Sequence, residues 1–182
     1  MELDPSRYTH LLHPCPAVLV SCADPPGKGN LIAIAWITPV SVDPPLLAMS
    51  IRPQRYSYDR TVRSGDFAVN VMAYRYAAAV LLCGRRSGRD LDKWAATGLT
   101  PIPARVVQAP LVAEAAAHVE CRLVEQIPMG DHTLFVGAVV AATVDEGLVA
   151  GGPFDLTRFQ PLLHVGRNLF ATTQPEVAEP PA

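Results

Sequence analysis

The sequence predicts a mainly β protein with a few short helices, folded as an antiparallel β-barrel. Three observations support this prediction. The chain contains several short apolar or alternating runs, turn residues separate these runs, and strands do not alternate regularly with long helices. In addition, the 182 residues are 49% hydrophobic and 18% charged, which suits a single globular domain and excludes intrinsic disorder.

The first strands follow from apolar runs bounded by turns. Residues 17–23 and 31–40 are apolar and are joined by a turn-rich segment at 24–30, so they predict a hairpin. Residues 46–52 predict a third strand, and residues 67–72 predict a fourth. These four segments form the first half of the expected barrel.

The run at 31–40 also carries a prediction about assembly. Its residues are apolar on both faces, whereas a strand of an antiparallel sheet usually has one face in water. A second copy of the chain is the simplest cover for the other face. The run therefore predicts a homodimer.

Short helices are expected between the strands. Residues 57–64 predict one, with Ser57 as its N-cap or first-turn residue. Residues 74–83 predict a second helix that stops at Gly84, and a third, short helix is expected to end near Gly98.

Two further strands are expected in the second half. Residues 118–123 alternate in polarity, and residues 132–144 form a long apolar run after a turn at Gly130 and Asp131. Because neighbouring residues on a strand point to opposite faces, Asp131 and His132 are not expected to work as a pair. The chain is expected to divide into an arm at 1–13, a domain at 14–173 and a disordered Pro-rich tail at 174–182.

Charge and composition exclude several classes of protein. A net charge of −2 and a pI near 6.2 argue against a nucleic-acid binder. No apolar run is long enough for a membrane span, and the N-terminus lacks the pattern of a signal peptide, so a cytoplasmic protein is expected. The four cysteines include no C-x-x-C pair and are expected to be buried free thiols, with no metal site. His10 and His13 are expected on the surface.

One group of polar residues could bind a ligand. Arg52 and Arg55 precede a predicted helix that begins near Ser57, and a hydroxyl, two guanidinium groups and a helix start can hold a phosphate. The alternative is a solvated helix start. Trp36 could lie in the core or could offer a surface on which a ligand stacks. Lys93 could bind a ligand or could simply be exposed to solvent. No nucleophile lies beside a base in the sequence, so a cofactor would have to supply the chemistry of an enzyme.

A series of short motifs resembles the flavin reductase-like family of FMN-binding split barrels, especially its flavoredoxin-like branch. The motifs are NLIAIAW (30–36), SVDPP (41–45), SIRPQRYS (50–57), GDFAVN (65–70), CGRRSGRDLDKW (83–94), APL (109–111), HVEC (118–121) and HTLFVG (132–137). Their order along the chain, more than any single motif, makes the resemblance specific. It covers most of the chain from Pro14 to Phe170.

The resemblance implies an FMN site at the interface of a homodimer, with NAD(P)H as the electron donor. It implies that His132 lies near the flavin on the side where a nicotinamide would stack. The residues it implies for FMN binding are Asn30, Trp36, Arg52, Arg55, Ser57, Lys93 and Phe170. Ala33 departs from the family pattern, because many relatives carry Thr there.

Three functions therefore remain open. The first is an NAD(P)H-dependent flavin oxidoreductase that passes electrons to an acceptor such as a flavin-dependent monooxygenase. The second is an FMN electron carrier that a protein partner reduces without any nicotinamide. The third is a barrel that binds a different ligand, because a fold does not dictate a function.

Overall fold

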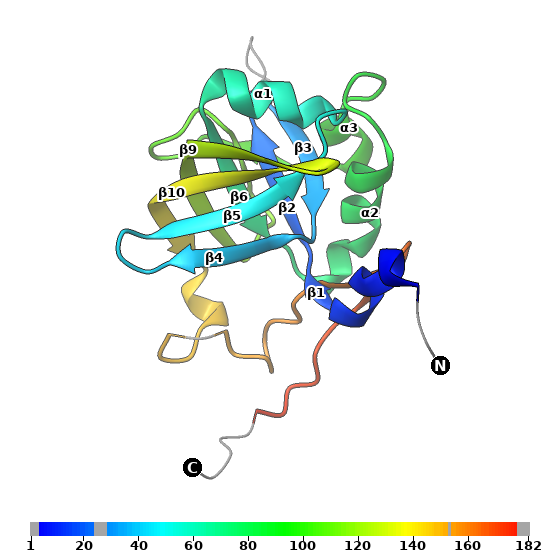
Figure 1. Cartoon of the computed structure of the whole chain (residues 1–182). Helices are drawn as coiled ribbons and strands as arrows, with labels where there is room; N and C mark the ends of the chain where they lie inside the picture. The colour runs from blue at the N-terminus through cyan, green and yellow to red at the C-terminus, as the bar shows by residue number, and fades with distance from the viewer. Residues whose placement is uncertain (1–3, 24–28, 153, 178–182) are drawn as a thin grey trace.

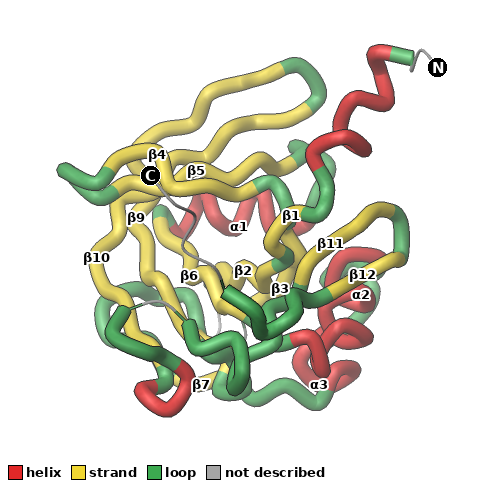
Figure 2. Tube along the Cα trace, turned by 90° about the horizontal axis from the view of Figure 1, so that it is seen from below, coloured by secondary structure: helices red, strands yellow, loops and turns green. Residues whose placement is uncertain are grey.

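A seven-stranded antiparallel sheet curls into a half-barrel and forms the centre of the molecule (Figures 1 and 2). This computed structural model describes residues 4–23, 29–152 and 154–177. The strands of the sheet, from one edge to the other, are β3 (Asn30–Ile34), β2 (Val18–Cys22), β6 (Asp66–Val71), β9 (Ala117–Met129), β10 (His132–Val144), β5 (Leu46–Ile51) and β4 (Ile37–Ser41). The predicted fold class is confirmed.

Smaller elements surround this sheet. The helices are α1 (Tyr56–Ser64), α2 (Ala77–Arg85) and α3 (Lys93–Thr97), with 3-10 helices η1 (Pro5–Leu12), η2 (Tyr74–Tyr76) and η3 (Glu146–Leu148). A three-stranded sheet joins β1 (Cys15–Pro16), β11 (Leu163–Gly166) and β12 (Leu169–Ala171), and a third sheet pairs β7 (Pro101–Ile102) with β8 (Leu111–Val112). None of the helices that the structure describes is long and apolar enough to cross a bilayer.

The predicted single strand at 31–40 is wrong, because the chain breaks at Ala35 and Trp36. The two pieces, β3 and β4, lie at opposite edges of the curled sheet. The outer side of β3 packs against α2 and α3 of the same chain, while much of β4 is exposed (Figure 1). The second apolar face is thus covered within one chain, so burial of this run no longer argues for a homodimer. The homodimer itself stays a prediction.

The second helix also differs from the prediction at its end. It begins with the 3-10 turn η2, and α2 then continues through Gly84 to Arg85 instead of stopping at the glycine. A Cβ at position 84 would lie 3.3 Å from the Cβ of Ala33 on β3. Gly84 therefore serves close packing of α2 on β3, whereas Gly98, with a φ of 70°, caps α3 as predicted.

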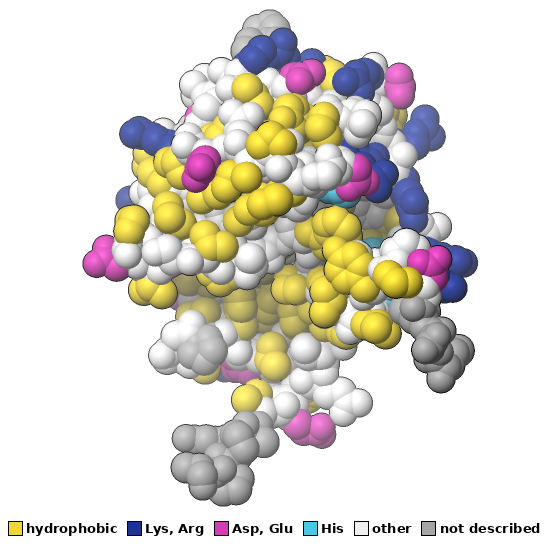
Figure 3. Space-filling view, viewed as in Figure 1, with side chains coloured by type: hydrophobic (Ala, Val, Ile, Leu, Met, Phe, Trp, Pro, Cys, Tyr) yellow, Lys and Arg dark blue, Asp and Glu magenta, His cyan; other side chains and the backbone are white. Residues whose placement is uncertain are grey.

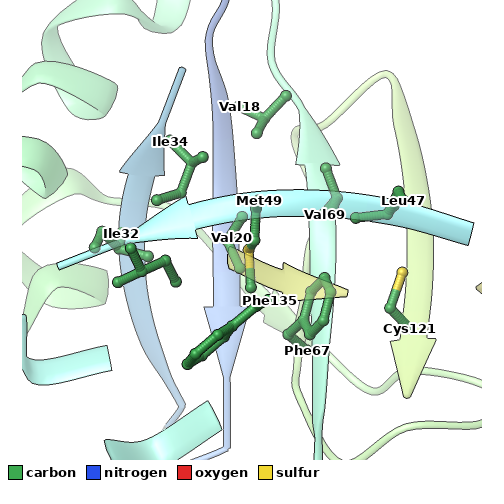
Figure 4. Packing of buried hydrophobic residues seen from close by; sticks show 11 residues of the cluster. Val18, Val20, Ile32, Ile34, Leu47, Met49, Phe67, Val69, Cys121 and Phe135 are labelled. Carbon is green, nitrogen blue, oxygen red and sulfur yellow. The ribbon is translucent and has the colours of Figure 1, made fainter. Parts of the chain in front are cut away.

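Two apolar cores stabilise this arrangement. Inside the curl of the sheet, large side chains such as Phe67, Phe135 and Met49 pack together and are fully buried (Figure 4). A second cluster, which includes Leu31 and Trp94, lies between the sheet and the helices. The four cysteines are free thiols, as predicted. Three of them are buried, and Cys15 is only half-buried.

Three predicted segments fall partly outside the described residues. They are positions 1–3 of the predicted arm, positions 24–28 of the predicted hairpin turn and positions 178–182 of the predicted tail. Residues 174–177 have no helix or strand. The strands on either side of the turn, β2 and β3, pair antiparallel, with Val18 opposite Ile34 and Cys22 opposite Asn30, so the hairpin pairing is confirmed.

Candidate functional site

A cleft of about 380 Å³ lies where β3, β5 and β10 approach the N-terminal arm. Basic and aromatic side chains dominate its wall. The residues that line it are Thr9, His10, His13, Ile32, Ala33, Ile34, Ala35, Trp36, Ser50, Ile51, Arg52, Arg55, Gly84, His132, His164, Gly166 and Arg167. No aspartate or glutamate is among these lining residues in the described part of the chain. The cleft therefore favours an anionic ligand.

Two aromatic rings form one wall of the cleft. The indole of Trp36 and the imidazole of His132 have centroids 4.9 Å apart at an interplanar angle of 38°. Trp36 lies in the break between β3 and β4, and it remains 41% exposed although it is a large apolar side chain. An exposed tryptophan beside a cleft offers a flat surface on which an aromatic ligand can stack.

His132 is held by a hydrogen bond to Asp131, which also forms an ion pair with Arg52. Its Nδ1 lies 2.6 Å from Asp131 Oδ1, and the other carboxylate oxygen, Oδ2, lies 2.7 Å from Arg52 Nη2. The hydrogen bond from His132 is the main reason why the pKa of Asp131 lies below its usual range. Because a carboxylate only accepts, Nδ1 is the nitrogen that carries the proton, and Nε2 is left for a ligand.

The expectation that Asp131 and His132 would not pair is therefore wrong. The rule of opposite faces applies within a strand, but β10 begins at His132, and Asp131 belongs to the turn before it. Gly130 in the same turn has a φ of 60°, so the backbone there is not extended. The side chain of Asp131 can consequently bend back to its neighbour.

The second wall is the start of α1. Arg55 is the N-cap residue and Arg52 precedes it, and both line the cleft. Ser57 lies in the first turn and is buried, and its Oγ accepts a hydrogen bond of 2.7 Å from Asn30 Nδ2. Asn30 is the first residue of β3, so this bond ties the start of α1 to the sheet behind the cleft.

The loop before α3 packs closely against this bond. A Cβ on Gly88 would overlap Asn30 Oδ1 and would lie 2.8 Å from Tyr56 Cδ1. Arg89 Nη1 also donates to the carbonyl of Gln54, at 3.2 Å. The Ser-Gly-Arg-Asp sequence at 87–90 thus serves as a support for the start of α1, and only glycine fits at its second position.

Lys93 lies behind the cleft and does not line it. The side chain is buried at the start of α3, and Nζ donates to the carbonyls of Leu31 and Cys83, each at 2.7 Å. Burial, the main cause, lowers the pKa of Lys93. The lysine links β3 to α2 directly beside Ala33 and Gly84, which do line the cleft. Its predicted contact with the cofactor stays a prediction.

Phe170 is also set back from the cleft. It lies on β12, is half-buried and packs against the second core cluster. Its ring contacts His164, with centroids 5.5 Å apart, and His164 lines the cleft. Of the predicted residues, Trp36, Arg52, Arg55 and His132 therefore line the cleft together, and Asn30, Ser57, Lys93 and Phe170 lie behind it.

The sequence reasoning missed the part of the cleft formed by the two ends of the chain. His10 and His13 of the arm were expected on the surface, and His164 and Arg167 were not singled out, yet all four line the cleft. His10 is exposed, so that expectation is confirmed in part, whereas His13 is half-buried. Nothing in the sequence pairs His13 with a residue 151 positions away.

A family model for the flavin reductase like domain matches residues 10–173 of the chain. The chain belongs to this family. The predicted family is thereby confirmed, and the match covers almost all of the residues that the structure describes.

Two relatives illustrate the range of this family. A protein of Aeropyrum pernix without an assigned function is 36% identical over 160 residues, which is 87% of this chain and 60% of that protein. The chain thus spans about three fifths of that relative. The reductase subunit HsaB of a flavin-dependent monooxygenase from Rhodococcus jostii is 29% identical over 138 residues, which is 75% of this chain and 68% of that one.

Solved structures with the same fold include a flavoredoxin and an FMN-binding protein. The flavoredoxin of Desulfovibrio vulgaris has a TM-score of 0.87 and 29% identity, and the match covers 98% of this chain and 97% of that one. An FMN-binding protein from Thermus thermophilus, solved with bound 1-cyclohex-2-enone, has a TM-score of 0.83 and 28% identity. This match covers 99% of this chain and 97% of that one. The split-barrel fold is shared along the whole of each chain.

Proposed function

We propose that this flavin reductase-like protein binds FMN in the basic cleft, accepts hydride from NAD(P)H and passes the electrons to an acceptor. One observation carries the proposal. An aromatic wall, formed by the exposed ring of Trp36 and the half-buried ring of His132, faces the same cleft as two arginines at the start of α1. A ligand with a flat aromatic part and a phosphate matches both features.

The arginine side suits the phosphate of FMN. Arg52 and Arg55 can offer forked, charge-assisted hydrogen bonds, and the N-terminal end of α1 adds a partial positive charge. The hydrogen bond from Asn30 to Ser57 holds this helix start in place. A site that is already ordered loses little entropy when the ligand binds, so these buried contacts favour affinity without touching the phosphate.

The aromatic side suits the flavin ring, which supplies hydride-acceptor and electron-donor chemistry when FMN is bound. Trp36 would shield one side of the ring system from water. His132 would present Nε2 to the cleft, because Asp131 accepts the hydrogen bond from Nδ1. The imidazole can then hold or exchange a proton at Nε2, while the fixed arginines stabilise negative charge in the cleft.

The proposal includes a homodimer. Beside the cleft is a mostly apolar groove of about 350 Å³, lined by Tyr8 and Leu12 of the arm and by Ile37, Ala48 and Leu134 of the sheet, among others. Apolar side chains gather over β4, β5 and η1 on this face of the molecule (Figure 3). Trp36 lines both the groove and the cleft, so a second chain that covered the groove would also close the proposed flavin site on one side.

The acceptor is proposed by analogy with relatives. Because HsaB is the reductase subunit of a flavin-dependent monooxygenase, a monooxygenase that uses reduced flavin is the acceptor we propose. The likeness to flavoredoxin favours a second function, that of an FMN electron carrier reduced by a redox protein. Both functions use the same cleft, and they differ in the electron donor.

Anaerobic reduction distinguishes the two functions. The purified protein should be yellow or should become so with FMN, and it should bleach when NADH or NADPH is added in a stopped-flow spectrometer. Bleaching only with a reduced redox protein would favour the carrier. A protein that binds no flavin at micromolar concentration would contradict both.

A further inference from the structure

Two histidines from opposite ends of the chain meet at the mouth of the cleft. His13 follows the 3-10 helix η1, and His164 belongs to β11. Their facing nitrogens, His13 Nε2 and His164 Nδ1, are 3.2 Å apart. The rings have centroids 5.1 Å apart and an interplanar angle of 72°. Nothing in the proposed flavin function accounts for this contact.

The hydrogen bonds of the two outer nitrogens determine where the protons lie. His13 Nδ1 is 2.6 Å from the carbonyl oxygen of Thr9, and His164 Nε2 is 3.3 Å from that of Arg167. A carbonyl oxygen only accepts, so each outer nitrogen carries its hydrogen. In two neutral rings, the facing nitrogens are then both unprotonated, and their lone pairs point at one another. A contact of this kind is relieved either by a proton on one of the facing nitrogens or by a metal ion bound between them.

The geometry fits a metal ion bound by both rings. Two imidazole nitrogens at about 2.0–2.1 Å from a tetrahedral ion lie about 3.3–3.4 Å apart, with ring centroids about 5.2 Å apart. Both values are close to the observed separations. A metal-binding histidine also commonly donates its other N–H to a backbone carbonyl, which fixes the ring, and both rings do this here.

We propose that His13 and His164 bind one divalent transition-metal ion of the Zn²⁺ class, and that the ion fastens the N-terminal arm to β11. Among the residues that the structure describes, no three His, Cys, Asp or Glu side chains are grouped around a common point. The protein therefore supplies two ligands, and the other positions are left for water or for an anionic oxygen of a ligand in the cleft. The proposal does not depend on flavin binding.

The surroundings set the expected affinity. The neighbouring guanidinium groups are cationic: Arg85 donates to the carbonyl of Arg167, and Arg167 lines the same cleft. Two neutral ligands in cationic surroundings predict a dissociation constant on the order of 10 µM, far weaker than that of a structural zinc site.

Calorimetric titration of the full-length protein with Zn²⁺ at pH 7.5, after removal of metals by a chelator, tests the proposal. We expect one ion per chain, and His13→Gln and His164→Gln should each weaken binding at least tenfold. Two control variants should bind as the wild type does. In His118→Gln the lost ring is held by Thr143 and Val112 away from the cleft, and in Cys15→Ser the lost thiol faces the apolar groove.

A second measurement covers the case in which a variant fails to fold. Nitrogen-15 NMR of the wild-type histidine rings should show that Zn²⁺ shifts His13 Nε2 and His164 Nδ1 more than any nitrogen of His118. The absence of saturable binding up to about 1 mM, or binding that only Cys15→Ser removes, would overturn the proposal. So would ring signals that report a shared proton and do not respond to the metal.

Discussion

The buried and the exposed polar groups of the cleft are held in place in different ways. On the buried side, behind the cleft, Asn30, Ser57 and Lys93 form hydrogen bonds to one another or to the backbone. On the exposed side, Arg52 before α1 and Asp131 in the turn before β10 form an ion pair whose side chains are 52% and 69% exposed. A buried polar group is costly to leave without a partner, whereas an exposed ion pair contributes little to stability.

The buried and the exposed polar groups of the cleft should therefore have different roles. The buried side should determine whether the cleft has the right shape, and the exposed side should determine how strongly it attracts an anion. Substitutions on the buried side should therefore lower stability more than ligand affinity. Substitutions on the exposed side should lower ligand affinity more than stability.

The largest loss of stability is expected for Lys93→Met. The variant keeps the volume of the side chain but leaves the carbonyls of Leu31 and Cys83 without their donor. Removal of the buried charge offsets part of this cost, so we expect the free energy of unfolding to fall by about 2 kcal/mol. Urea denaturation measures it, and a variant as stable as the wild type would contradict a structural role for the lysine.

The pH dependence of stability gives a second test of Lys93. Its pKa in the folded protein is lowered, so between that lowered value and the ordinary value the unfolded chain binds more protons than the folded protein does. The wild type should therefore gain stability as the pH rises toward the ordinary lysine value of 10.5, and Lys93→Met should lack this gain. Parallel pH profiles for the two proteins would count against the assignment.

Gly88→Ala should be the next most damaging change. The added methyl group meets the side chains of Asn30 and Tyr56, so one of them must move. We expect a loss of about 1.5 kcal/mol in stability, within the usual range for overpacking, together with weaker FMN binding. Gly147→Ala serves as the control, because its Cβ would meet only Asp145 Oδ1, at 3.3 Å, and it should leave FMN binding unchanged.

Ser57→Ala and Arg52→Ala compare one substitution on the buried side of the cleft with one on the exposed side. Ser57→Ala should lower stability by about 1 kcal/mol, and Arg52→Ala by less than about 0.5 kcal/mol. For FMN affinity the order should reverse, with a loss of about 10- to 150-fold for Arg52→Ala and a smaller loss for Ser57→Ala. If the same variant showed the larger loss in both thermal stability and FMN affinity, the distinction between the buried and the exposed side would be wrong.

The smallest effect on stability is expected for Asp131→Asn. The pKa of Asp131 is lowered from 3.8, so the carboxylate is ionised throughout the neutral range, and its ion pair should weaken only as the pH falls through that lowered value. At pH 7, Asp131→Asn should still bind FMN but should be reduced more slowly by NAD(P)H, because an amide oxygen accepts a weaker hydrogen bond from His132 Nδ1 than the carboxylate does and holds the ring less firmly. His132→Ala should behave in the same way. If either variant loses flavin and the bound remainder is reduced at the normal rate, the residue belongs to cofactor binding.

Much of the fold could be predicted because its signals are local. Turn residues bound the strands, and the Gly98 cap follows from a short-range rule. The alternation at 118–123 predicts a strand there, but its polar face is not in water throughout, because Glu120 is buried. The exceptions needed information from distant parts of the chain. No local signal shows that Ala35 and Trp36 interrupt an apolar run, or that Gly84 lies inside a helix because Ala33 packs against it.

The candidate site divides in the same way. Arg52, Arg55 and Ser57 are close in sequence to a helix start, so their grouping could be predicted from position alone. Asp131 was set aside by a rule for strands that does not hold in a turn. The contact between His13 and His164 joins the two ends of the chain, and only the folded structure brings these rings together.

The central claim is that the cleft recognises a flavin by its phosphate at the start of α1 and by its ring at Trp36. Titration of the wild type, Arg52→Ala and Trp36→Ala with FMN and with riboflavin, which lacks the phosphate, tests both parts directly. We predict that the wild type prefers FMN at least tenfold, that Arg52→Ala loses most of this preference, and that Trp36→Ala weakens both ligands while keeping it. An FMN preference that is unchanged in Arg52→Ala, or flavin binding that is unaffected by Trp36→Ala, would contradict this assignment of the cleft.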